Sequence, residues 1–372
     1  MELNIWDLPI NKFYVKLNKD FVEEALSKIK SKYGSYKKFY NKYNIVESTF
    51  FGWRRNCLYP LPIVIKLCKL LGIPLDYMQK SVTELKSKPY PSKGGDISSP
   101  IFPNFPLKLS LELVRLIAHM LGDGCITLNK KGHYNFQYYN KSEHLREMFK
   151  ADSRKVFGNL YIHEAVNKGT PYIFLPAPVA IIFLHLVKDF HSKKSRVPKF
   201  IKTSSSKVKR EFIKSIFDDE GSVKFRKNER NIEFALSNKP FVNDVKILLN
   251  EFGIKTSKIS ERTDKKGYYK AYFYIRNYHN ISKFYKSIGF YHPKKQKKLE
   301  EIIKFPGRKS YARGETKKLI INLLEERPFS TFELSKKLER SIVNVDIFAR
   351  RLKNDGKIER FKTGKQLLWR VK

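Results

Sequence analysis

Two stretches in the middle of the chain place apolar residues at helical spacing, and each ends in an acidic residue followed by glycine. The first is Leu116-Ile-Ala-His-Met-Leu-Gly-Asp-Gly124, and the second is Ile213-Lys-Ser-Ile-Phe-Asp-Asp-Glu-Gly221. The first stretch has small residues four positions apart, Ala118 and Gly122, and the second has one small and one acidic residue, Ser215 and Asp219. Such pairs share one face of a helix and let two helix backbones approach closely. The pattern predicts two helices that pack side by side and present Asp123 and Glu220 at the same end.

The segments that follow the two helices repeat one order of elements, helix-strand-strand-helix-strand-strand-helix. In the first repeat we expect a helix at 110–122, strands at 125–129 and 133–140, a helix at 142–157, strands at 160–166 and 171–175, and a helix at 177–190. In the second we expect a helix at 207–219, strands at 221–226 and 231–237, a helix at 239–252, strands at 256–262 and 268–276, and a helix at 278–288. This repetition predicts an α+β fold with pseudo-twofold symmetry, which suits the two strands of a duplex.

Alternation within the strands separates a polar face from an apolar one. The residues expected on the polar face are Gln137, Tyr139, Lys224, Arg226, Lys270, Tyr272, Tyr274 and Arg276. A sheet face of this composition fits a saddle over DNA, where such groups reach phosphates and base edges. An ordinary solvent-facing sheet has the same alternation, and the pattern alone does not exclude it.

The two ends of the chain have their own patterns. Residues 1–86 predict a helical domain in which the helix near 48–55, with Arg54 and Arg55, resembles the recognition helix of a helix-turn-helix protein. A plain helical bundle with Trp53 in its core is the alternative. Residues 317–372 predict three helices and two strands, an order that resembles a winged helix, with Arg350 and Arg351 available to DNA. The alternative there is a small protein-binding domain.

Between these parts, two segments lack the pattern of long regular elements. Residues 87–108 are dense in Pro, Gly and Ser, and residues 305–316 are basic. We therefore expect linkers at both places, flanking a central domain at 109–304 that divides into repeats at 109–195 and 196–304.

Composition narrows the class of partner. Lys and Arg number 75 against 36 Asp and Glu, so the formal net charge is +39. A compact fold with that excess repels itself unless a polyanion neutralises it, which makes nucleic acid the natural partner. No apolar run is long enough to span a membrane, and three cysteines without CxxC spacing favour reduced core thiols over a zinc site. We expect a cytoplasmic protein that acts as a monomer.

The doubled motif and its flanks resemble the single-chain, two-motif form of the LAGLIDADG homing endonucleases. Further matches are Asn140-Lys-Ser-Glu-His-Leu145, Arg196-Val-Pro-Lys-Phe-Ile201 and Ile288-Gly-Phe-Tyr-His-Pro293, and the resemblance covers roughly residues 110–305. It implies a pair of units that form a β-saddle on double-stranded DNA. It also implies that Asp123 and Glu220 hold Mg²⁺ or Mn²⁺, each in one of two nearby sites that cut one strand apiece.

The resemblance also assigns a basic group near the attacking water. Lys141 stands at the family position in the first repeat, whereas Ser237 stands there in the second, so Lys224 or Lys270 would substitute. Asp219 is a second departure, because the family prefers a small residue at that helix contact. His119 lies among apolar neighbours, which favours a core histidine over a metal ligand.

These observations favour a site-specific, metal-dependent DNA endonuclease. A DNA-binding transcriptional regulator that kept the fold without cutting, and an RNA maturase, remain the alternatives. Protein splicing is disfavoured because the chain lacks the terminal residues that splicing chemistry uses.

Overall fold

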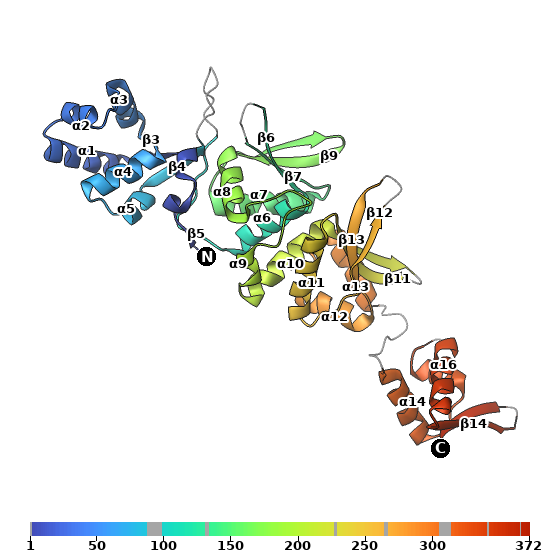
Figure 1. The fold of residues 1–372 in the computed structure, drawn as a ribbon. Helices are drawn as coiled ribbons and strands as arrows, with labels where there is room; N and C mark the ends of the chain where they lie inside the picture. Colours follow the sequence, from blue (N-terminus) through green and yellow to red (C-terminus); the bar gives the residue numbers. More distant parts are fainter. Residues whose placement is uncertain are drawn as a thin grey trace.

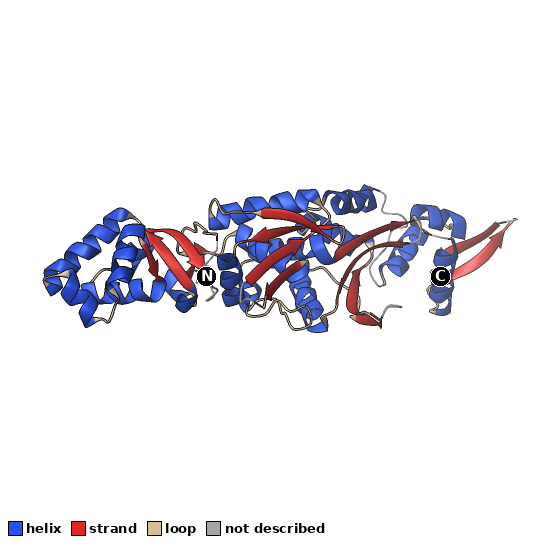
Figure 2. Cartoon of the chain, turned by 90° about the horizontal axis from the view of Figure 1, so that it is seen from above, coloured by secondary structure: helices blue, strands red, loops and turns tan. Residues whose placement is uncertain are grey.

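The computed structural model of this chain describes residues 2–87, 99–130, 134–226, 229–263, 267–304, 314–340, 342–364 and 366–372, with the side chain of Arg226 left out. Figure 1 shows an amino-terminal domain, two central units and a carboxy-terminal domain in chain order, and Figure 2 shows that each part carries its own strands. The mixed helix and sheet architecture agrees with the α+β prediction.

The first central unit follows the expected order of elements. It comprises α6 (Leu111–Gly122), β6 (Gly124–Leu128), β7 (Tyr134–Tyr139), α7 (Glu143–Phe157), β8 (His163–Asn167), β9 (Thr170–Leu175) and α8 (Ala177–Val187). The strands form an antiparallel sheet in the order β6-β7-β9-β8. Ser110 begins α6 because its side chain accepts a hydrogen bond from the Leu113 amide at 3.2 Å.

The second unit repeats this order and adds a helix. After the short α9 (Lys199–Lys202) come α10 (Ser206–Glu220), β10 (Gly221–Arg226), β11 (Glu229–Leu236), α11 (Lys239–Glu251), β12 (Ser260–Thr263), β13 (Tyr269–Ile275), α12 (Tyr278–Ser287) and α13 (Pro293–Lys304). Its sheet has the equivalent order β10-β11-β13-β12. The sequence reading did not include α13, which packs against α12 and β10.

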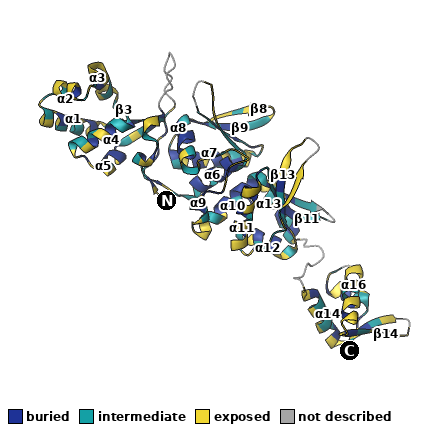
Figure 3. Ribbon diagram, in the orientation of Figure 1, coloured by how far each residue is buried: buried dark blue, intermediate teal, exposed yellow. Residues whose placement is uncertain are grey.

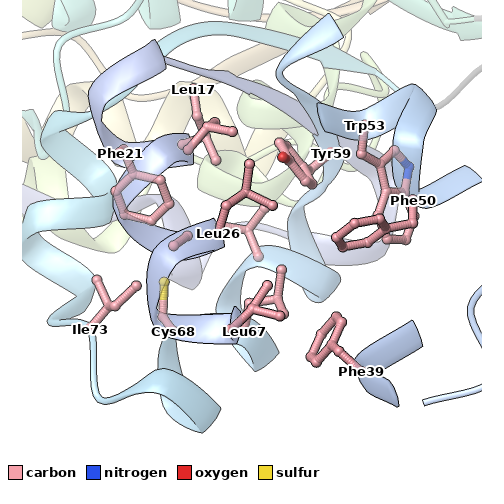
Figure 4. Close-up of a pocket in the computed structure, with 14 residues that line it drawn as sticks. Leu17, Phe21, Leu26, Phe39, Phe50, Trp53, Tyr59, Leu67, Cys68 and Ile73 are labelled. Carbon is pink, nitrogen blue, oxygen red and sulfur yellow. The ribbon is translucent and has the colours of Figure 1, made fainter. Parts of the chain in front are cut away.

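The amino-terminal domain was expected to be helical, and the structure corrects that expectation. Helices α1 (Lys19–Tyr33), α2 (Tyr36–Lys42), α3 (Glu47–Asn56), α4 (Leu61–Leu71) and α5 (Leu75–Lys80) accompany a three-stranded sheet of β2 (Phe13–Leu17), β3 (Leu58–Pro60) and β4 (Val82–Ser87). Apolar side chains from α1, α3 and α4 meet in its interior, with Leu26 and Cys68 among them (Figure 4). The strands escaped prediction because they are short: β2 and β4 lie at the edges of the helical run, and β3 has only three residues between α3 and α4.

The segment expected to be a linker at 87–108 is packed where the structure describes it, from residue 99 onward. Ile101 pairs with Leu85, and β5 (Leu107–Lys108) pairs with β1 (Glu2–Leu3). Phe102 donates its amide to the Phe157 carbonyl at 2.7 Å. These contacts join the amino-terminal domain to the first unit, and the buried residues of both belong to one continuous core.

The carboxy-terminal domain contains α14 (Glu315–Glu326), α15 (Thr331–Lys337), α16 (Ile342–Asn354), β14 (Ile358–Thr363) and β15 (Gln366–Val371), in the expected order. Its buried residues form a core separate from that of the rest of the chain, and Figure 3 shows the dark buried positions of each body. The expected linker at 305–316 lies largely outside the described residues, which resume at 314.

Candidate carboxylate site at the paired helix ends

Helices α6 and α10 pack against each other, and Gly122 of α6 comes close to Asp219 of α10 near their carboxyl ends. A Cβ atom added to Gly122 would lie 2.9 Å from both the Cβ and an oxygen of Asp219, so only glycine fits there. Ala118 and Ser215, the small residues expected at this contact, are fully buried. The predicted helix pair is therefore present.

The acidic residues Asp123 and Glu220 lie at the adjoining carboxyl ends of these helices. Burial and then the charge of Asp219 raise the pKa of Asp123, against the lowering effects of Lys295, His119 and Asn140, and the result is a pKa of about 7. Burial likewise raises the pKa of Glu220 to about 8, with contributions from Asp123 and Asp219. A carboxyl group whose pKa is raised by the charge of another acid lies near that acid, so the acidic residues at these two helix ends lie close together.

Asp219 sits between the two units at the centre of a buried hydrogen-bond network. The Tyr138 hydroxyl donates to its Oδ1 at 2.9 Å, and His119 Nδ1 lies 2.9 Å from its Oδ2. The Asn140 amide donates to Asp219 at 3.0 Å and to Asp123 at 3.2 Å. Burial holds the pKa of Asp219 well above its usual range. His119 is thus a core residue, as expected, but one that contacts a carboxylate.

Asp218 and Lys295 complete the end of α10. Asp218 accepts hydrogen bonds from the amides of Tyr291 and His292, at 3.0 and 2.8 Å, and so anchors the turn before α13. Lys295, on α13, donates its ammonium to the backbone carbonyls of Phe217 and Asp219 at 3.2 and 3.3 Å, and to that of Asp218. No spacing signal in the sequence links Lys295 to the motif, and the sequence reading missed it.

The donor set fits a divalent ion of the Mg²⁺ type. Two carboxylates, each raised in pKa by burial and then by the charge of nearby acids, supply hard oxygen ligands. Mg²⁺ often uses only one or two carboxylates while keeping several waters. Among the described residues no group of three or more His, Cys, Asp and Glu could hold a metal. Asp123 and Glu220 are the residues that would hold the ion.

The basic residues proposed from the sequence lie in different surroundings. Lys141 is exposed at the start of the α7 segment. Lys224 lies 3.2 Å from Glu229 and 3.3 Å from Glu233, so its ammonium is already paired. Lys270 is exposed, and its charge lowers the pKa of Glu220. Of these lysines, Lys270 is therefore the one whose charge reaches the second carboxylate.

The predicted alternation of the sheet faces is confirmed in β13. Ala271, Phe273 and Ile275 are fully buried, whereas Tyr272 and Tyr274 are half-buried, and Lys270 and Arg276 are exposed. Arginine side chains make cation–π contacts with both half-buried tyrosines. The guanidinium of Arg276 lies 4.3 Å from the Tyr274 ring centre, and that of Arg262 lies 4.6 Å from the Tyr272 ring centre. In the first unit, Tyr139 donates a hydrogen bond to Gln137 at 3.1 Å on the corresponding face. The side chain of Arg226 lies outside the described part.

The terminal domains present their candidate DNA contacts on helices. Arg54 and Arg55 are exposed at the end of α3, and Trp53 is half-buried with its ring 5.8 Å from that of Tyr59. On α16, Arg350 and Arg351 are exposed, and Arg350 binds Asp346 at 2.8 Å. The same helix exposes aliphatic side chains, namely those of Ile342, Val343 and Ile347.

Two α/β units joined through adjacent helices, each helix ending in an acidic residue under a four-stranded sheet, define a paired-motif protein. Residues 207–289, which span most of the second unit, match the family model of the LAGLIDADG-like domain. Residues 207–289 thus form a LAGLIDADG-like domain, and the resemblance drawn from the sequence is confirmed there.

Curated relatives share only part of their length with this chain. A replication factor C small subunit of Methanocaldococcus jannaschii is 30% identical over 198 residues, which is 52% of this chain and 10% of that protein. A tRNA-splicing ligase RtcB of Pyrococcus abyssi is 28% identical over 42% of this chain and 19% of its own length. Because the chain spans a fifth or less of these relatives, and their names differ, their named activities are not assigned to it.

Solved structures also overlap the chain. I-DmoI in complex with DNA and Ca is 15% identical, with a TM-score of 0.39, and covers 51% of this chain and 97% of its own. Full-length DUF199/WhiA from Thermatoga maritima is 16% identical, with a TM-score of 0.37, and covers 67% of this chain and 92% of its own. No helix among the described residues is long and apolar enough to cross a membrane.

Proposed function

We propose that this protein is a site-specific endonuclease that hydrolyses both strands of double-stranded DNA with a divalent metal, Mg²⁺ or Mn²⁺. The observation that carries the proposal is the placement of Asp123 and Glu220 at the adjoining ends of α6 and α10, where burial and then neighbouring acids raise the pKa of each. Crowded carboxylates of this kind favour a bound cation.

The chain's own residues divide the work. Asp123 and Glu220 supply oxygen ligands, and Asn140 holds Asp123 through a hydrogen bond at 3.2 Å. A divalent ion held there would activate water and offset the charge that develops on the phosphate. Lys270 places a positive charge near Glu220, and we assign it a supporting role at the second carboxylate. Lys141 and Lys224 remain candidates from the family resemblance.

DNA binding belongs to the same proposal. A net charge of +39 supplies electrostatic affinity for the duplex, which falls steeply as salt rises. We assign the groove contacts to the polar sheet faces, among them Gln137, Tyr139, Lys270, Tyr272, Tyr274 and Arg276, and Arg226 stays a candidate from its position in β10. Arg54, Arg55, Arg350 and Arg351 would extend the contact from the terminal domains. A cytoplasmic monomer fits this role.

A second function, DNA binding without cleavage, is favoured by one feature. Asp219 occupies the helix contact where the family prefers a small residue, and it takes hydrogen bonds from Asn140, the residue next to the family lysine position. A site altered in this way suits a transcriptional regulator that retained the fold.

The decisive experiment measures cleavage of DNA from around the chain's own gene with Mg²⁺, in the full-length protein. Asp123→Asn and Glu220→Gln should each lower the rate of double-strand cleavage by about 10³-fold or more while leaving DNA affinity unchanged. Asp76→Asn, at an exposed carboxylate on α5, is the matched control and should cut normally.

Each alternative has its own outcome in this assay. Tight, sequence-selective DNA binding with no metal-dependent cutting by the unaltered protein would favour the regulator. Tighter binding of intron RNA than of duplex DNA would favour the maturase. Unchanged cutting by both carboxylate variants would refute the metal assignment.

A further inference from the structure

Lys295 reaches the carboxylate site from an element that lies outside both motifs. Its ammonium lies on the last carbonyls of α10, those of Phe217, Asp218 and Asp219. An ammonium has three donor hydrogens, and three backbone oxygens at a helix carboxyl end are a favourable place for a cation. The backbone of α10 thus fixes the position of this charge.

The surrounding contacts hold Lys295 in this position. Asp218, at the end of α10, accepts both the Tyr291 and the His292 amide, and these two residues directly precede α13. The turn therefore docks onto α10 and delivers Lys295, two residues into the helix, to the carbonyls. The tertiary contacts of the turn and of α13 therefore hold the Lys295 side chain at the end of α10.

Acidic residues dominate the charge environment of Lys295. Burial lowers its pKa, and the opposing effects come from Asp219, Asp218, Asp123 and Glu220, which include both proposed metal ligands. Lys295 in turn lowers the pKa of Asp123 and of Glu220. The ammonium that the last carbonyls of α10 hold is therefore within electrostatic reach of the acidic group at the ends of α6 and α10.

We propose that Lys295 is the resident counter-cation of the carboxylate site: it stabilises the crowded carboxylates in the metal-free protein and weakens their attraction for a divalent ion. The inference rests on the proposed metal site. It makes Lys295 a positioning residue that acts through Asp123 and Glu220, and it predicts two opposite consequences of removing the charge.

The two consequences follow from Coulomb's law. Without the ammonium, the metal-free carboxylates repel one another with less compensation, so the apo protein loses stability. Removing the ammonium also removes a positive charge that repels an incoming divalent cation, so the cation binds more tightly. A lysine that merely capped α10 would give the first effect without the second.

The test compares full-length wild type, Lys295→Gln, Lys295→Met and Lys295→Arg by thermal unfolding in chelator and across a Ca²⁺ titration. Glutamine keeps a donor for the carbonyls and removes the charge, so it serves if the methionine variant fails to fold. Lys209→Met is the matched control, because Lys209 is also a largely buried lysine at α10. It lies near the start of that helix, away from the site, and binds Glu251 at 2.6 Å.

For Lys295→Gln we expect a lower Tm in chelator and a roughly tenfold lower half-saturating Ca²⁺ concentration than wild type. Lys295→Arg should keep the wild-type Ca²⁺ response, and Lys209→Met should lower the Tm with no change in that response. Ca²⁺ binding by Lys295→Gln that equals or falls below wild type would overturn the inference. Failure of the metal site itself gives a different result, since the wild-type Tm would then not respond to Ca²⁺ at all.

Discussion

The two central units have the same backbone but differ in polarity where they meet. The first contributes His119, Tyr138 and Asn140 to the interface, and all three contact Asp219 of the second. The pairing of Gly124 with Tyr138 and of Gly221 with Phe234 aligns the strands of the two units. On this alignment the second unit places Ile216, Phe234 and Leu236 at the equivalent positions.

The difference shows that the pseudo-twofold symmetry extends to the backbone and not to the chemistry. Asp219 of α10 lies opposite Gly122 of α6, the equivalent position of the first unit. The three polar partners of Asp219 all come from that first unit. A buried carboxyl group is tolerated only with such partners. We infer that the network favours pairing of the first unit with the second over pairing of like with like.

The largest expected effect comes from removing the centre of this network. Asp219→Ala should lower the free energy of unfolding by about 4 kcal/mol, because three buried groups each lose a partner. Denaturant unfolding of the full chain measures the change. Asp76→Ala, at an exposed carboxylate, should change stability by no more than about 0.5 kcal/mol.

A double-mutant cycle tests whether the loss arises in the network. In a Tyr138→Phe background, Asp219→Ala should cost about 1 kcal/mol less than in the wild type, because one stranded donor is already gone. Equal costs in both backgrounds would mean that the Tyr138–Asp219 hydrogen bond contributes nothing to the loss.

The sequence predicted the repeated order of elements because both repeats have long periodic helices and alternating strands, signals that survive in single sequences. It also placed Asp123 and Glu220 at one end of the helix pair. The sequence identified Asp219 as a departure from the small residue that the family prefers. It could not predict the hydrogen bonds that stabilise this carboxyl group, because Tyr138 and Asn140 belong to the other unit. Lys295 was missed for the same reason, since the turn that delivers it is set by tertiary contacts to Asp218.

The amino-terminal region shows a related limit. Pro, Gly and Ser at 87–108 suggested a linker, yet Ile101 and Leu107 are buried. Short β-bridges to Leu85 and Leu3 carry this packing, and they involve residues far away in the sequence. The composition of a segment indicates its local conformational preference, and it does not reveal pairing with residues from other parts of the chain.

The next effect in size compares the two arginine-aspartate pairs of the units. Arg115 binds Asp152 with two contacts of 2.7 Å and reaches Glu211 on α10 at 2.9 Å, with its side chain only 14% exposed. Arg196 binds Asp244 with the same two distances, but its side chain is 54% exposed and Lys202 also contacts Asp244 at 2.9 Å.

Arg115→Met should therefore cost about 3 kcal/mol, because it leaves two buried carboxylates without their cation. Arg196→Met should cost about 1 kcal/mol, since Asp244 keeps Lys202. Chemical denaturation of both variants measures the difference. Equal losses would mean that burial does not separate the two pairs, and the contrast between the units would then be confined to the Asp219 network.

The smallest effect concerns an ion pair that both units have with its signs exchanged. In the first, Glu112 at the start of α6 binds Lys155 on α7 at 2.5 Å, and in the second, Lys209 at the equivalent position of α10 binds Glu251 on α11 at 2.6 Å. The acidic residue of the first unit lies in the first turn of its helix, where the helix dipole favours a negative charge, whereas the second unit places a lysine there.

This exchange predicts an acid sensitivity located in the first unit. Burial raises the pKa of Glu112, but hydrogen bonds from Lys155, its own backbone amide and Ser110 outweigh burial and hold that pKa at about 2, below its ordinary value of 4.5. A carboxyl group with a lowered folded-state pKa contributes stability above pH 4.5 and loses it as the pH falls from about 4.5 toward 2. After allowance for solvent screening the contribution is about 1 kcal/mol. Glu112→Gln should flatten the fall in stability over that range, measured by urea unfolding at stepped pH.

Glu251→Gln is the matched control in the second unit. Its side chain is 44% exposed, so we expect a smaller change. A change as large as that of Glu112→Gln would remove the proposed difference between the two ion pairs.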